Sequence, residues 1–78
     1  MDERKYLVVN VSGNTEKVLH SYTDRDEAIS KMNIIGKRNR SGGIICVILG
    51  RELANGNIAR GRETIAVYDA WLERLLKD

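Results

Sequence analysis

The sequence predicts an α+β domain in which a small mixed sheet of three to four strands carries two helices on one face. Three patterns favour this class: a period of two near the start, helically spaced apolar residues in the middle, and an uninterrupted apolar run after them. The predicted order of elements is β-β-α-β-(β)-α, and we expect residues 1–78 to form a single compact domain.

The first two elements are predicted to be a β-hairpin. Residues 5–11 place Leu7, Val9 and Val11 on one side, which is the alternation of a strand. Residues 12–14, Ser-Gly-Asn, are typical of a turn. Residues 16–22 are predicted to return as the second strand, although their alternation is weaker.

A helix is predicted to begin after Thr23, whose hydroxyl can accept a hydrogen bond from the first turn. Three acids that follow it suit the positive N-terminal end, and Lys37 and Arg38 suit the negative C-terminal end. Residues 39–43 end the helix. The residues expected on its buried face are Ala28, Ile29, Met32 and Ile35.

The apolar run at residues 44–49 predicts a strand that is buried on both faces and is therefore central in the sheet. After it, Asn55-Gly56 predicts a two-residue hairpin turn of type I′. That turn would place Arg51 directly opposite Arg60, a like-charge pair that calls for a compensating anion.

The end of the chain, from Glu63 onward, is predicted to be an amphipathic helix because apolar residues recur at helical spacing as far as Leu75. Residues 63–68 also alternate with a period of two, so a fourth strand is the alternative for this segment.

Positive charge is concentrated in residues 37–62, which hold six bases and one acid, a net charge of +5. The rest of the chain holds seven bases and ten acids, a net charge of −3. This asymmetry predicts one face that binds an anionic partner. The residues of this predicted basic face are Lys37, Arg38, Arg40, Arg51, Arg60 and Arg62.

Five of these six bases are arginines, and the guanidinium group suits bidentate contact with phosphate or carboxylate. We therefore expect a partner that is a nucleic acid or a nucleoprotein complex. Few aromatic residues are placed to stack on bases, so contact with the backbone should dominate. An acidic protein surface is an alternative partner, and a solvated edge that discourages aggregation is the third interpretation.

The sequence predicts a protein that is not an enzyme and that needs no cofactor or metal. His20 is the only histidine and Cys46 the only cysteine, and Cys46 lies in the apolar run, where a buried thiol is inert. One histidine, one cysteine and scattered carboxylates provide no tetrahedral metal site.

A second functional hypothesis is a protein-interaction module, such as a regulator or a phage-type inhibitor that docks on a larger host protein. It would use a sheet edge and the last helix, with Tyr68 and Trp71 at the interface, and it allows a homodimer. Because no apolar run approaches the length of a membrane span and no signal-peptide pattern follows Met1, we expect a cytoplasmic protein without membrane contact.

Overall fold

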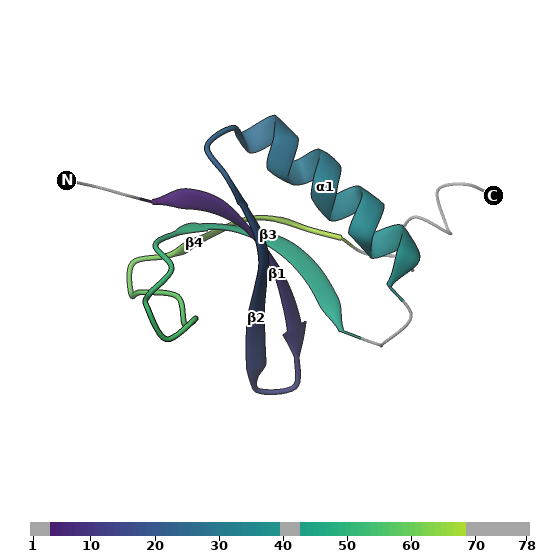
Figure 1. Ribbon diagram of the computed structural model, residues 1–78. Helices are drawn as coiled ribbons and strands as arrows, with labels where there is room; N and C mark the ends of the chain where they lie inside the picture. Colours follow the sequence, from purple (N-terminus) through teal and green to yellow (C-terminus); the bar gives the residue numbers. More distant parts are fainter. Residues whose placement is uncertain (1–3, 40–42, 69–78) are drawn as a thin grey trace.

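The computed structural model describes residues 4–39 and 43–68, within which four strands and one helix form a small α+β fold (Figure 1). The helix α1 lies across one face of a four-stranded sheet whose strand order is β2-β1-β3-β4. The elements are β1 (Lys5–Ser12), β2 (Thr15–Tyr22), α1 (Arg25–Arg38), β3 (Ile44–Gly50) and β4 (Glu63–Val67).

Every strand pairing within the described residues is antiparallel, so the predicted mixed sheet is wrong. The helix joins β2 to β3, and these two strands run in the same direction. However, β1 lies between them and is antiparallel to both, so they form no parallel pair.

The first hairpin is as predicted, and a β-bulge explains its weak second half. Val8 pairs with His20 whereas Val9 pairs with Val18, which leaves Leu19 as the extra residue. Leu19 therefore packs on the helix side of the sheet, while Val18 packs on the opposite side. This one extra residue interrupts the period-two alternation of apolar and polar side chains in β2, which is why the sequence pattern of this strand is weak.

Helix α1 begins at Arg25, one residue later than a cap at Thr23 would give. The N-cap is Asp24, whose carboxylate accepts a hydrogen bond from the Asp26 N–H at 3.1 Å. Lys37 and Arg38 occupy the last turn, as expected. No helical segment in the described part of the chain combines the length and the apolar character that a membrane crossing requires.

The sheet has an apolar cluster on each face, and β3 contributes to both, which confirms the prediction of a strand buried on two sides. On the helix side, Ile45 and Val47 of β3 pack with Ala28 and Met32 of α1. On the opposite side, Cys46 and Ile48 pack with residues of β1, and Ile58 from the connection between β3 and β4 packs against them.

Residues 63–67 form a strand, so the favoured helix is wrong for this segment and the alternative is confirmed. The reason lies in β3, because an apolar strand with an open edge would leave its backbone groups unpaired away from water. β4 supplies these partners, and a bulge at Ile65 lets both Ile65 and Ala66 pack on the helix side. The remainder of the predicted last helix lies outside the described residues.

The connection at residues 51–62 folds back as a short ribbon, but its turn is not the predicted one. The Leu53 carbonyl accepts a hydrogen bond from the Gly56 N–H at 2.9 Å, and only Gly56 of the Asn55-Gly56 pair has a positive φ, of 87°. This is a three-residue loop closed by a glycine bulge. Compared with the predicted two-residue turn, the pairing of the two ribbon strands is shifted by one residue, so the Arg51 carbonyl accepts a hydrogen bond from the Ala59 N–H. The predicted Arg51–Arg60 pair is therefore wrong.

Candidate nucleic-acid interface

The predicted basic face is divided between the two ends of β3. Lys37 and Arg38 end α1, near the start of β3, whereas Arg51, Arg60 and Arg62 follow its far end. A seven-residue strand separates the two groups by about 20 Å. The described residues therefore do not form one continuous patch, and Arg40 lies outside them.

Arg62 is engaged within the protein. Its guanidinium forms an ion pair with the carboxylate of Glu16, at the start of β2. The pair lies on the sheet face opposite the helix, because Glu16 pairs with Val11, which packs on that face, and both charges act on Cys46 of the same face. Glu16 neutralises this arginine, whereas Arg51 and Arg60, which are also exposed, form no ion pair within the described residues.

The ion pair lies near Cys46, the free cysteine at the centre of the same face. Burial raises the pKa of the Cys46 thiol, and the negative charge of Glu16 raises it further, while Arg62 opposes them. A thiol in this state is a poor nucleophile at neutral pH.

We expect the raised Cys46 pKa to make stability depend on alkaline pH. The unfolded chain loses its thiol proton first, near the ordinary thiol pKa of about 8.5. The folded protein holds the thiol proton more tightly, and this adds to the free energy of unfolding. The added stability is complete below the unfolded pKa and is lost as pH rises through the folded pKa, by up to about 1.4 kcal/mol per pH unit. Urea unfolding from neutral pH to about pH 10 should show the decline, and Cys46→Ala should lack this part of it. Identical pH profiles for the two proteins would contradict the assignment.

Two bases outside the predicted basic face lie at the same end as Arg51 and Arg60. Lys5 pairs with Gly50 in the sheet, and Arg4 precedes it. The segment that carries Arg60 is held there because the backbone of Gly50 packs closely against Ile58 and Arg62. We call Arg4, Lys5, Arg51 and Arg60 the basic end; the nearby acids are Glu52 and Glu63.

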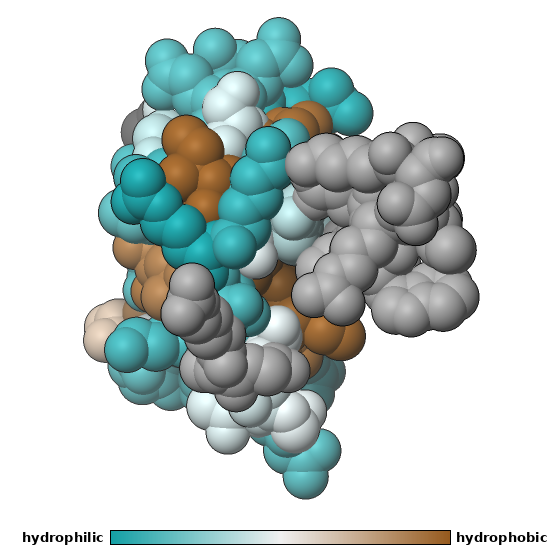
Figure 2. Space-filling view, turned by 90° about the vertical axis from the view of Figure 1, so that its right-hand side faces the viewer, coloured by the Kyte–Doolittle hydropathy of each residue, from teal (hydrophilic) through white to brown (hydrophobic). Residues whose placement is uncertain are grey.

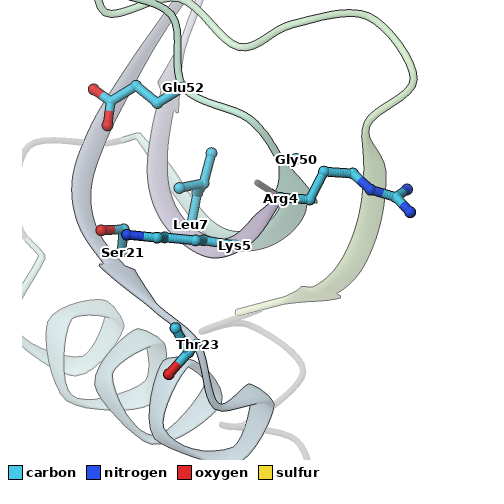
Figure 3. Close-up of a pocket in the computed structure, with 7 residues that line it drawn as sticks. All are labelled: Arg4, Lys5, Leu7, Ser21, Thr23, Gly50 and Glu52. Atoms are coloured by element: carbon cyan, nitrogen blue, oxygen red, sulfur yellow. The ribbon is translucent and has the colours of Figure 1, made fainter. Parts of the chain in front are cut away.

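A pocket of about 610 Å³ opens at the basic end. Figure 3 shows the Lys5 side chain extending toward Ser21 and the Arg4 side chain extending the opposite way, with Glu52 on the far side of Leu7. Cations, hydroxyls and a carboxylate thus surround the position of Leu7, which is itself buried. The residues that line the pocket are Arg4, Lys5, Leu7, Ser21, Thr23, Gly50 and Glu52.

A second, shallower pocket of about 390 Å³ runs along the start of α1 and has the opposite charge. Three carboxylates and one ammonium group line it, so it repels phosphate. Its lining residues are Tyr22, Asp24, Asp26, Glu27, Ser30, Lys31 and Ile34. Of these two pockets, only the one at the basic end suits an anion.

The structure gives Tyr68, one of the two predicted interface residues, a packing role. Its N–H donates to the Ile45 carbonyl at 2.8 Å, and its ring lies against Gly36 of α1. Trp71 lies outside the described residues. On the face that Figure 2 shows, apolar side chains form separate areas between hydrophilic ones.

Within residues 4–39 and 43–68, no three histidine, cysteine or carboxylate residues come together as a metal site would require. No protein-family model matches the chain, and no curated protein or solved structure shows significant similarity to it. The basic end is therefore the feature from which a function is inferred.

Proposed function

We propose that this protein is a small non-enzymatic binding protein that contacts the phosphate backbone of a nucleic acid, free or within a nucleoprotein complex, through its basic end. The observation that supports this function is the pairing of Lys5 with Gly50. It brings Arg4 and Lys5, at the start of β1, to the same end as the ribbon that carries Arg51 and Arg60.

The character of these side chains favours phosphate over an acidic protein surface. Arg51 and Arg60 are exposed, and guanidinium forms strong bidentate bonds to phosphate oxygens. Protein interfaces usually have an apolar centre, whereas the only exposed large apolar residue of the ribbon is Leu53 at its turn. The basic end thus resembles a backbone-contact surface.

We expect the double variant Arg51→Ala/Arg60→Ala to weaken binding to all sequences by similar factors. The loss of two phosphate contacts should also reduce the slope of log affinity against log salt by about 1.4 for single strands and about 1.8 for duplexes. Fluorescence-anisotropy titration of labelled DNA and RNA over a series of salt concentrations measures both effects.

The double variant Lys37→Ala/Arg38→Ala is the matched control, because it removes the same charge from the other end of β3. Binding that falls more in this variant than in Arg51→Ala/Arg60→Ala would move the interface to the end of α1. Absence of salt-dependent binding by the unmodified protein would overturn the proposed function.

A second candidate function is docking on a protein through β4, one of the two edge strands of the described sheet. Val67 on this strand is 54% exposed, and an extended peptide of the partner would add to the strand by main-chain hydrogen bonds. Val67→Lys should then abolish capture of the partner while the affinity for nucleic acid stays unchanged.

A further inference from the structure

We infer that the pocket at the basic end holds one unpaired nucleotide, and that Glu52 selects bases with an exocyclic amino group. This inference rests on the proposed function, because it takes the nucleotide to be part of a strand whose phosphates contact the basic end. It adds a base preference to a surface that otherwise contacts only the backbone.

The size and the lining of the pocket fit a nucleotide. A volume of about 610 Å³ lies in the range of about 300–1,000 Å³ that is usual for small-molecule sites. Leu7, which is only 1% exposed, and the buried Gly50 form the floor of the pocket, so a bound base would lie over them and between the charged side chains. The hydroxyls of Ser21 and Thr23 can donate to phosphate or sugar oxygens.

The charges of the pocket are arranged for a ligand with two different ends. Among the described residues, neither Lys5 nor Glu52 forms an ion pair, although both line the same pocket. Figure 3 places them on different sides of Leu7. A ligand that bridges them must carry negative charge at one end and hydrogen-bond donors at the other.

A nucleotide meets this requirement when its phosphate contacts Lys5 and its base edge faces Glu52. Arg4 and Lys5 are consecutive and extend in opposite directions, so of these two it is Lys5 that is placed to contact the phosphate of the bound nucleotide.

The carboxylate of Glu52 determines which base is accepted, because an ionised carboxylate only accepts hydrogen bonds. Cytosine presents an amino group at the position where uracil presents a carbonyl oxygen, and a carboxylate accepts from the former and repels the latter. The base edge must be unpaired to reach Glu52, so the ligand is a single strand.

The test compares oligodeoxycytidylate with oligodeoxyuridylate of the same length, which differ at the edge that Glu52 would read. The unmodified protein should bind the cytosine strand about tenfold more tightly near neutral pH, the size expected for one hydrogen bond to a charged group. Glu52→Gln should remove this preference, because an amide can also donate to the uracil oxygen. Lys5→Ala should weaken binding to both strands by the same factor.

Glu52 is exposed, so Glu52→Gln should leave the fold intact, and far-ultraviolet circular dichroism checks this. As an independent measure, the NMR shifts of the Ser21 and Gly50 amides should move on titration with the cytosine strand, while that of Ala28 should not. Equal binding of the two strands, or a preference that persists in Glu52→Gln, would overturn the pocket inference and leave backbone binding standing. If neither strand binds even at low salt, both the inference and the proposed function are wrong.

Discussion

Replacing Ile45 with alanine is expected to lower the free energy of unfolding by about 2–5 kcal/mol. Ile45 is only 1% exposed and lies in the middle of the apolar cluster between the sheet and α1. The shorter side chain loses its own transfer free energy and leaves a cavity between β3 and Met32 of the helix. A domain of 78 residues has a total stability of about 4–12 kcal/mol, so this loss is a large share of it.

The neighbouring residue gives a matched control on the same strand. Ile44 is 53% exposed, and Ile44→Ala should change stability by no more than about 0.5 kcal/mol. Urea denaturation followed by circular dichroism measures both variants, and Ile45→Val should fall between them, at about 0.5–1.5 kcal/mol. Equal losses at positions 44 and 45 would contradict the described orientation of β3.

The contrast between Ile44 and Ile45 shows how far the sequence predicts the core. An uninterrupted apolar run identifies a strand buried on both faces, and the structure confirms this for the middle of the run. The pattern does not reveal that the first residue of the run lies at the edge of the cluster, because that depends on where neighbouring strands end.

Two other differences arise because one local pattern is compatible with two structures. Residues 63–67 fit both a helix and a strand, and the choice is made by the open edge of β3, which is a tertiary feature. Asn55-Gly56 fits both a two-residue and a three-residue loop, since each needs a glycine with positive φ. Here the Asn55 side chain accepts a hydrogen bond from the Asn57 N–H at 3.0 Å, which supports the longer loop.

The candidate site was predicted only in part for a similar reason. The charge asymmetry identified Arg51 and Arg60 but also included Lys37 and Arg38, which are near them in sequence and distant in space. Arg4 and Lys5 were missed because their position depends on the pairing of β1 with β3. Sequence proximity is a poor guide to a surface that antiparallel strands assemble from segments about 45 residues apart in the chain.

Replacing Gly36 with alanine is expected to destabilise the protein by about 1–2 kcal/mol, although alanine is the better helix former. Gly36 lies in the last part of α1, and a methyl group there would overlap the ring of Tyr68. The ring cannot simply withdraw, because the Tyr68 backbone is hydrogen bonded to the Ile45 carbonyl. The strain of overpacking, about 1–3 kcal/mol, therefore exceeds the gain in helix propensity of up to about 1 kcal/mol.

The sign of this effect should reverse when the ring is removed. In a Tyr68→Ala background the methyl group meets open space, so Gly36→Ala should stabilise the protein by up to about 1 kcal/mol. Asn33→Ala, at an exposed position of the same helix, serves as the control and should be neutral or slightly stabilising in both backgrounds. A double-mutant cycle by urea denaturation gives the coupling between Gly36 and Tyr68 directly. If Gly36→Ala stabilises the protein with Tyr68 present, the ring does not pack on the helix, and Tyr68 becomes available for the docking role that the sequence predicted.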